Sequence, residues 1–247
     1  MILLLNDTSN YHSGCDAVVR SYEFDRSIKT NELVTKINWN HYDKVILNGE
    51  GTMHDNQHTA LKFLRALGYA HADGCEIQIH NTVWQHMSHD YDDVLKRCTE
   101  ITVREALSQQ EMLKHGVEAK IVPDRSVMIE VPYKEYPEVY IYDGQPSRKS
   151  MKIESDKPRI NIFEQSWDEV VNRLRHTEFI VTGRHHEMYA AIKAKCRFIV
   201  SEGNTWKNRG LLETVGAQID MQDREGILSG KYDTEYEKIF DYCLHTK

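Results

Sequence analysis

An arginine and two histidines follow an apolar stretch of strand-like composition in the second half of the sequence. Residues 178–182 form this stretch, and Gly183 separates it from Arg184, His185 and His186, where a helix should begin. In an open α/β sheet, ligands bind at the carboxyl ends of strands, beside the first turns of the following helices. We therefore interpret these residues as an anion-binding group, in which His186 could also serve as a general acid.

Positive charge is concentrated around this group although the protein is acidic. The formal net charge of −7 argues against a protein that coats nucleic acid along its whole surface. Residues 173–209 nevertheless contain eight Lys or Arg against three Glu, a local excess of +5. A solvated helix face accounts for Lys193 and Lys195, and a buried ion pair is the alternative for Arg184. A cation at the positive end of a helix dipole is unfavourable without an anion, which favours the ligand-binding interpretation of Arg184.

The composition is typical of a soluble protein, and we expect a cytoplasmic one. No apolar run approaches the roughly 20 residues of a membrane span, and the apolar residues 1–5 are too short for a signal sequence. The five cysteines are odd in number, widely spaced and without a CxxC pair, so we expect reduced thiols and neither a disulfide framework nor a zinc site. The 13 histidines include no HExxH motif, so we expect no metal.

Glycine-containing segments also follow strand patterns in the first half of the chain. Residues 43–47 predict a strand that ends in Asn48-Gly49-Glu50-Gly51-Thr52. Two glycines so close together permit the tight backbone that cradles an anion or a sugar. Glu50 lies between them, where a carboxylate has few structural reasons to occur, and is a candidate general base. Asp16 is a second candidate, although an acidic residue at this point could equally stabilise the start of a helix.

Strand and helix patterns alternate along the whole chain, which predicts parallel βαβ units. We expect an α/β fold of two Rossmann-like lobes facing a cleft, with an N-terminal lobe at residues 1–132, a reduced second lobe at residues 138–230 and a terminal helix at residues 231–247. The predicted strands are residues 1–5, 43–47, 75–79, 101–103, 120–122, 139–142, 159–163, 179–182 and 198–200. The predicted helices are residues 16–22, 59–72, 90–98, 108–115, 166–174, 187–194, 211–214 and 232–245, and residues 32–37 form a short helix or strand.

Four segments, in this order and spacing, resemble the polysaccharide pyruvyl transferase family. They are residues 10–17 (Asn-Tyr-His-Ser-Gly-Cys-Asp-Ala), residues 48–52, residues 101–124 and residues 182–186, the last followed by Lys207. The resemblance implies a GT-B-like fold and a metal-independent, cofactor-free transferase. Its donor would be phosphoenolpyruvate, and its acceptor a hydroxyl group of a glycan.

The resemblance also assigns sides to the two lobes. The second lobe would hold the small phosphorylated donor, and the first would hold the carbohydrate acceptor. By the resemblance, Arg104, Arg184 and His186 would hold the carboxylate and phosphate of the donor, and we expect His185 and Lys207 to bind the donor beside them. The acceptor-side loops would contain Gly14, Gly49, Gly51, Thr52, His54 and Trp84.

Two other functions remain open at this point. A metal-independent glycosyltransferase could use the same positive residues for the diphosphate of a UDP-sugar, and a compact, phage-type version could glycosylate a hydroxymethylated base in DNA. A binding module that has lost its chemistry is the other alternative.

Overall fold

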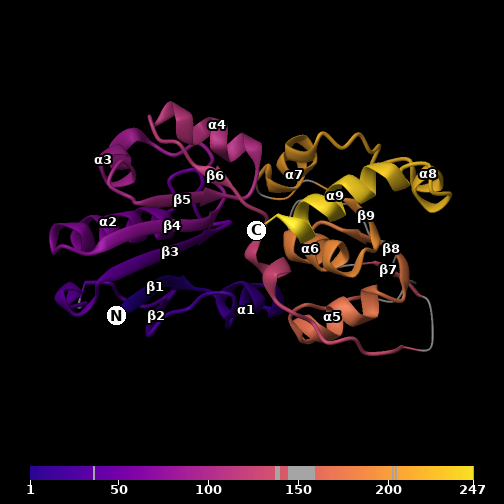
Figure 1. The fold of residues 1–247 in the computed structure, drawn as a ribbon, viewed down its shortest axis with the longest axis horizontal. Helices are drawn as coiled ribbons and strands as arrows, with labels where there is room; N and C mark the ends of the chain where they lie inside the picture. Colours follow the sequence, from indigo (N-terminus) through magenta and orange to yellow (C-terminus); the bar gives the residue numbers. More distant parts are fainter. Residues whose placement is uncertain (36, 137–139, 144–158, 202, 204, 247) are drawn as a thin grey trace. The chain divides into compact units, whose positions relative to one another are not determined.

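The computed structural model describes residues 1–35, 37–136, 140–143, 159–201, 203 and 205–246 (Figure 1). The chain forms two compact units. The first unit contains Met1–Thr8 and Tyr22–Val122, and the second contains Ser9–Ser21 and Pro123–Lys247.

Helix α1 (Ser13–Arg20) belongs to the second unit and not to the N-terminal lobe in which the sequence pattern placed it. It contacts α5 (Trp167–Leu174) and α6 (His185–Ala194). The amide of Ser13 also donates a hydrogen bond to the carbonyl of Ile162, at 2.9 Å. The helix that follows the first strand therefore contributes its residues to a different core from that of the strand.

The first unit is built on a six-stranded parallel sheet with the order β2-β1-β3-β4-β5-β6. Its inner strands are apolar and buried along most of their length, as expected for parallel strands that are covered on both faces. The strands are β1 (Ile2–Asp7), β2 (Arg26–Lys29), β3 (Lys44–Glu50), β4 (Glu76–Thr82), β5 (Glu100–Val103) and β6 (Lys120–Ile121).

The helices of the first unit lie between these strands in the sequence. Helix α2 buries apolar residues at a helical spacing, as its sequence predicts. The predicted helix at residues 108–115 begins earlier, because Glu105 and not Ser108 is its N-cap and accepts a hydrogen bond from the Ser108 amide at 2.9 Å. The helices are η1 (Trp39–His41), α2 (His58–Ala72), η2 (His89–Tyr91), α3 (Asp92–Leu95) and α4 (Ala106–Lys114).

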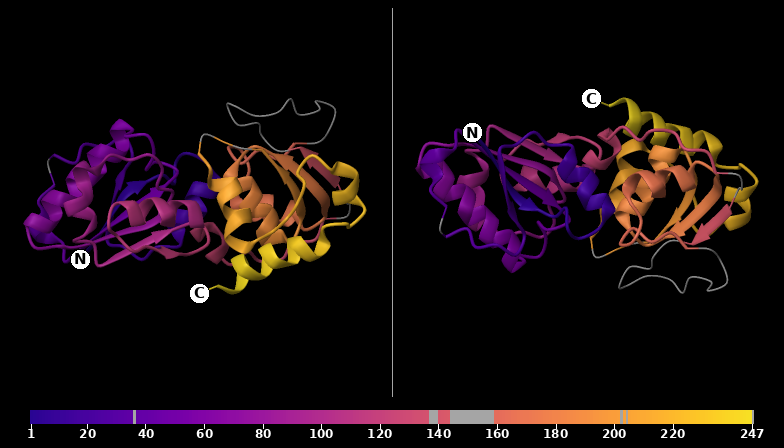
Figure 2. Two further views of the ribbon diagram at one scale, coloured as in Figure 1. Left: turned by 90° about the horizontal axis from the view of Figure 1, so that it is seen from above. Right: turned by 90° about the horizontal axis from the view of Figure 1, so that it is seen from below.

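The second unit contains a smaller parallel sheet with the order β7-β8-β9 in the described part of the chain. Figure 2 shows its helices around this short sheet, and α5 and α6 both contact β8. None of the described helices of either unit is long and apolar enough to cross a membrane. The elements not yet named are η3 (Arg125–Met128), β7 (Tyr140–Asp143), β8 (Thr177–Thr182), β9 (Arg197–Val200), α7 (Lys207–Val215), α8 (Arg224–Leu228) and α9 (Asp233–His245).

Three local predictions fail for identifiable reasons. Residues 159–163 are not a strand: the chain turns at Asn161, whose carbonyl accepts from the amides of Glu164 and Gln165. Ile160 and Ile162 are both buried, which explains the strand-like alternation. Residues 32–35 form turns and bends, and residue 36 lies outside the described residues. Strand β2 was missed because it is an edge strand with a single apolar residue.

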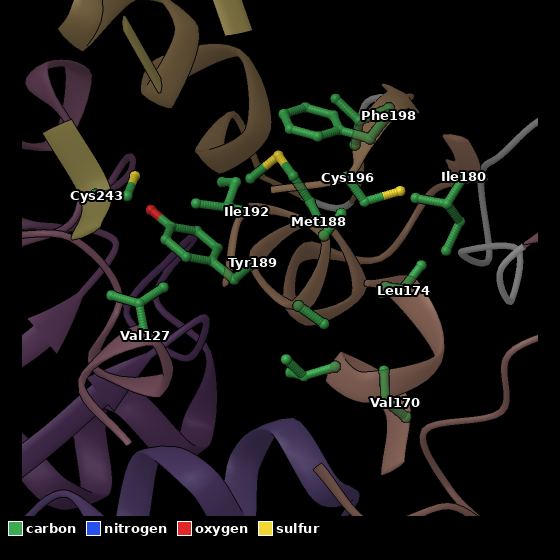
Figure 3. Close-up of a cluster of buried hydrophobic side chains, with 14 of the residues drawn as sticks. Val127, Val170, Leu174, Ile180, Met188, Tyr189, Ile192, Cys196, Phe198 and Cys243 are labelled. Carbon is green, nitrogen blue, oxygen red and sulfur yellow. The ribbon is translucent and has the colours of Figure 1, made fainter. Parts of the chain in front are cut away.

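Helix α6 runs through the core of the second unit. All residues from His185 to Ile192 are buried, and Met188, Tyr189 and Ile192 pack among side chains of neighbouring elements (Figure 3). A helix that is buried all round is held on every side. The first turn of α6, which carries His185 and His186, is therefore fixed in position by the core itself.

Candidate functional site

Three helices of the second unit begin beside one another. His12 is the N-cap of α1, Arg184 is the N-cap of α6, and Lys207 is the first residue of α7. The rings of His12 and His186 lie 5.0 Å apart, and the charges of Arg184 and Lys207 act on His12. Each helix N-terminus carries partial positive charge and free N–H groups. We call His12, Arg184, His186 and Lys207 the basic cluster, and its character is that of an anion site.

Gly14 allows the first turns of α1 and α6 to touch. A Cβ atom at Gly14 would lie 2.4 Å from the Cβ and 2.6 Å from the Cγ of His186. Real Cβ atoms do not approach so closely, so any larger residue would displace the imidazole. Gly14 was predicted to lie on the acceptor side, and the structure instead places it against the predicted donor-binding histidine.

The His12 side chain is neutral in the ligand-free protein. Desolvation, together with positive charge on His186, Arg184 and Lys207, lowers the pKa of His12 to about 2. Its Nδ1 accepts a hydrogen bond from the Cys15 amide at 3.2 Å, so the proton of the neutral ring lies on Nε2. The cluster thus contains a fixed imidazole that an incoming anion would make easier to protonate.

A buried carboxylate lies behind the two histidines of α6. Asp124 is fully buried, and its Oδ2 lies 3.5 Å from Nε2 of His185 and 3.8 Å from Nε2 of His186. Nδ1 of His185 lies 3.2 Å from Oδ1 of Asn208, whose Nδ2 donates to the carbonyl of Ser201 at 2.8 Å. His185 is therefore held between Asn208 and Asp124, which gives it a supporting place in the site, while His186 faces His12.

An exposed aromatic pair flanks the basic cluster. The guanidinium group of Arg184 lies 4.8 Å from the centre of the Phe163 ring, within the range of a cation–π contact. Phe163 and Tyr11 meet edge to face at 5.5 Å and are 44% and 61% exposed. The amide of Arg184 donates to Thr182 Oγ1 at 2.9 Å, which fixes the backbone that carries the guanidinium. The pair offers apolar ring surface next to an anion site.

In the first unit, Glu50 ends β3 in an unusual backbone conformation. Its φ of 42° lies in the left-handed region, as do those of Asn6 (62°) and Asn81 (56°) at the ends of the neighbouring strands. The buried Glu50 carboxylate accepts hydrogen bonds from Thr8 Oγ1 at 2.6 Å and from Asn48 Nδ2 at 3.3 Å. Residues held in sparsely populated conformations concentrate at functional sites. Glu50 is therefore a carboxylate that the sheet holds in one orientation.

The other predicted acceptor-side residues surround Glu50 along the chain. A Cβ atom at Gly49 would lie only 2.3 Å from the Cβ of Thr82, so the two residues are in close contact. The Thr52 amide donates a hydrogen bond to the carbonyl of Gly49 at 3.0 Å. Gly51 lies in the turn between them. His54 follows and pairs through Nδ1 with the carboxylate of Asp55, at 2.9 Å.

The structure corrects the prediction for Trp84. Its side chain is fully buried and packs against His115, so it belongs to the core and offers no face to a ligand. The sequence could not distinguish these two cases, because a tryptophan after a strand serves either purpose.

Two further candidates have structural partners. Arg104 is 1% exposed at the end of β5, and its charge opposes the rise that burial causes in the pKa of Glu105. It lies in the first unit, whereas Arg184 lies in the second. Asp16 forms an i,i+4 ion pair with Arg20 on α1, at 3.6 Å, and belongs to the second unit together with Gly14. Donor binding by Arg104 and catalysis by Asp16 stay predictions.

Three residues of this site were not predicted from the sequence to belong to the donor-binding group. From the sequence, His12 was interpreted as a polar loop residue or a residue lining the acceptor side, although its position directly before a helix was a signal for a capping residue. Asp124 followed a strand and a proline, which was a weak signal for a fixed carboxylate. Phe163 was assigned to a strand, so its exposure was not expected.

The donor atoms of His12, Cys15 and His186 lie within 4.8 Å of one another and could hold a metal ion. Arg184 and Lys207, however, place positive charge beside them, which disfavours a cation. A second group of possible ligands in the described residues, His89, Asp92 and His115, lies in the first unit.

Comparison with known families and structures gives a consistent result. The sequence pattern of the family described as polysaccharide pyruvyl transferase matches residues 5–202. A search of curated protein sequences gave no significant match.

Among solved structures, a functionally uncharacterised protein from Klebsiella pneumoniae is similar with a TM-score of 0.59 at 12% identity, covering 85% of this chain and 86% of the other. A protein assigned as a UDP-N-acetylglucosamine 2-epimerase from Listeria monocytogenes gives 0.62 at 9% identity, covering 98% and 90%. The UDP-GlcNAc 2-epimerase from Methanocaldococcus jannaschii gives 0.52 at 9% identity, covering 100% and 93%. At these identities the similarity shows the fold alone, and it confirms the predicted α/β class with Rossmann-like lobes of the GT-B type.

Proposed function

Because the chain belongs to the polysaccharide pyruvyl transferase family, we propose that it transfers a group from phosphoenolpyruvate to a carbohydrate hydroxyl. The observation that carries the proposal is the basic cluster of the second unit. There, the N-terminal ends of α1, α6 and α7 bring His12, Arg184, His186 and Lys207 together. The carboxylate of Asp124, which lies near His185 and His186, is fully buried behind them.

The chemistry of phosphoenolpyruvate suits this group of residues. Its carboxylate and phosphate are the planar and tetrahedral anions that an arginine fork and a lysine bind well. The guanidinium group of Arg184 already packs on the Phe163 ring, so it would lose less side-chain freedom on binding than a free arginine. Lys207 and the helix N–H groups would neutralise the phosphate.

Transfer requires one proton donor and one proton acceptor. The acceptor oxygen forms a bond to C2 of the donor, the methylene carbon takes up a proton, and the hydroxyl group loses one. The C2–O bond to the phosphate then breaks and inorganic phosphate leaves. A second hydroxyl group of the acceptor loses its proton and bonds to C2 in its place, which gives a ketal. His186, which lies beside Asp124, is the candidate acid. Glu50, the buried carboxylate of the first unit, is the candidate base.

The first test is the thermal stability of the purified protein with phosphoenolpyruvate, several UDP-sugars or duplex DNA. A ligand that binds only the folded state raises the melting temperature by mass action. We expect phosphoenolpyruvate to stabilise the wild-type protein and Arg184→Ala to lose that response. Stabilisation by UDP-sugars alone, or by DNA alone, would contradict the proposed donor.

A nucleotide-sugar donor is the second candidate, and one observation favours it. Phe163 and Tyr11 are exposed beside Arg184 and could stack on a uracil or sugar ring next to a bound diphosphate. Replacing Tyr11 by Ala should then weaken the binding of a UDP-sugar and leave the binding of phosphoenolpyruvate unchanged. A protein that binds neither donor, and whose Arg184→Ala variant behaves as wild type, would be the binding module of the third interpretation.

A further inference from the structure

A second cluster of histidine and carboxylate side chains lies in the first unit, apart from Glu50 and its hydrogen-bond partners. His89 in η2, Asp92 at the start of α3 and His115 at the end of α4 bring their donor atoms within 4.8 Å of one another. His115 follows Asp92 by 23 residues in the sequence, so it meets His89 and Asp92 only in the folded chain.

The carboxylate of Asp92 bridges the two imidazole rings. Its Oδ2 lies 2.8 Å from Nδ1 of His89, and its Oδ1 lies 2.6 Å from Nδ1 of His115. The two rings are 4.4 Å apart between centres. Both histidines therefore point the same ring nitrogen towards a single carboxylate.

Asp92 lies in an acidic stretch of the chain. Asp90 and Asp93 stand on either side of Asp92 in the same short segment. This segment therefore supplies local negative charge, which favours a cation.

The cluster combines a fixed ligand with an accessible one. The side chain of His115 is 2% exposed and packs against Trp84, which fixes its ring. The side chain of His89 is 67% exposed, so it can move and leaves the cluster open to solvent on one side. This arrangement provides three protein ligands and room for water in a fourth position.

From these observations we propose that His89, Asp92 and His115 form a binding site for a divalent transition-metal ion of the zinc type. Imidazole and carboxylate are ligands that suit Zn²⁺, Ni²⁺ and Co²⁺. Ligand atoms roughly 2.0–2.2 Å from a tetrahedral zinc ion stand about 3.3–3.6 Å apart. The His89–Asp92 separation of 2.8 Å would have to widen by about 0.5–0.8 Å, and the exposed His89 supplies that movement. The His115–Asp92 separation of 2.6 Å would have to widen by about 0.7–1.0 Å through rotation of the Asp92 carboxylate, because His115 is fixed. The bound ion would tie η2 and α3 to the end of α4.

The test measures the thermal stability of the metal-free full chain with Zn²⁺, Ni²⁺, Co²⁺ or Mg²⁺. We expect the first three ions to raise the melting temperature and Mg²⁺ to have no effect, since it prefers oxygen ligands. His89→Ala changes an exposed position, and Asp92→Asn keeps the shape of the side chain. Each should lower the affinity for the ion by at least about tenfold. The matched control is His58→Ala, which removes an exposed histidine elsewhere.

Cobalt distinguishes this site from the thiol-containing group of the second unit. Binding to His89, Asp92 and His115 should give a Co²⁺ spectrum without thiolate charge transfer, unchanged in Cys15→Ser. The proposal is overturned if these ions leave the melting temperature of the wild-type protein unchanged. The cluster would then only link η2, α3 and α4 by hydrogen bonds. The proposal is equally overturned if the response survives both substitutions and disappears in Cys15→Ser.

Discussion

Gly14 and His186 are in direct contact, although 172 residues separate them in the sequence. The missing side chain of Gly14 makes room for the imidazole of His186, whose Cβ would lie 2.4 Å from a Cβ at position 14. This contact joins the first turn of α1 to that of α6, and so brings His12 and His186 together.

Gly14→Ala should therefore disturb the basic cluster more than the overall fold. We expect the free energy of unfolding to fall by about 1–3 kcal/mol, because the added methyl group has to displace His186 or the helix. We also expect phosphoenolpyruvate to lose most of its stabilising effect. The control is Gly68→Ala in α2, where the new methyl group makes only ordinary contact at 3.4 Å with Val94 and should stabilise the helix. Equal behaviour of the two variants would count against the contact.

Arg184→Ala should weaken the binding of the donor by about 1.5–3 kcal/mol, or roughly 10- to 150-fold, since it removes a charge-assisted hydrogen-bond donor. Arg184→Lys keeps the charge but loses the planar fork, so it should recover only part of the affinity. Titration calorimetry with phosphoenolpyruvate measures both. Arg209→Ala, which removes a half-exposed arginine paired with Glu213 on α7, is the control and should bind normally. Full affinity in Arg184→Ala would remove this residue from the site.

The lowered pKa of His12 predicts an acid-sensitive fold. The pKa of His12 is 6.5 in the unfolded chain, the ordinary value for histidine, and about 2 in the folded protein, so the unfolded state binds more protons as the pH falls below about 6.5. The contribution of His12 is thus fully present above that pH and is lost progressively as the pH falls towards the folded value. Unfolding by urea, measured between about pH 5 and 6.5 and therefore above the titration of ordinary carboxyl groups, should show this slope.

Replacing His12 by Asn should reduce the slope, and His58→Asn at an exposed site should leave it unchanged. Because a bound anion offsets the charges of Arg184 and Lys207, it should raise the pKa of His12. Phosphoenolpyruvate should then bind more tightly at lower pH, with uptake of a proton. An affinity that does not change with pH would contradict this coupling.

Glu50→Gln tests the candidate base. The amide keeps the size of the side chain and an oxygen that can accept from Thr8, so the melting temperature should change little. The transfer rate should fall by about 10²- to 10⁴-fold with an unchanged KM for the donor, because an amide cannot take up the hydroxyl proton. Phosphate release from phosphoenolpyruvate in the presence of a glycan panel measures the rate. Glu118→Gln, at an exposed position, is the control, and a wild-type rate in Glu50→Gln would assign the base elsewhere.

Much of the architecture could be predicted from the sequence because it follows from local periodicity. The strands at residues 43–47 and 179–182 are apolar runs that end in glycine or polar residues, and they correspond to β3 and β8. The helix at residues 59–72 shows its buried face in its spacing and corresponds to α2. Arg184 and His186 were predicted as site residues for the same reason, since a strand end followed by a helix start marks a binding position in a parallel sheet.

The fold class, the family motifs and the residue types at the strand ends could be predicted from local sequence, because hydrophobic period and glycine placement act over short stretches of chain. Which of those residues meet depends on the folded structure. It placed His12 beside His186 and Asp124 behind it, enclosed Trp84 in the core and left Phe163 exposed. Burial and distance depend on how helices far apart in the sequence pack together, and that packing places the predicted anion-binding group of residues 184–186 among the N-terminal ends of α1, α6 and α7.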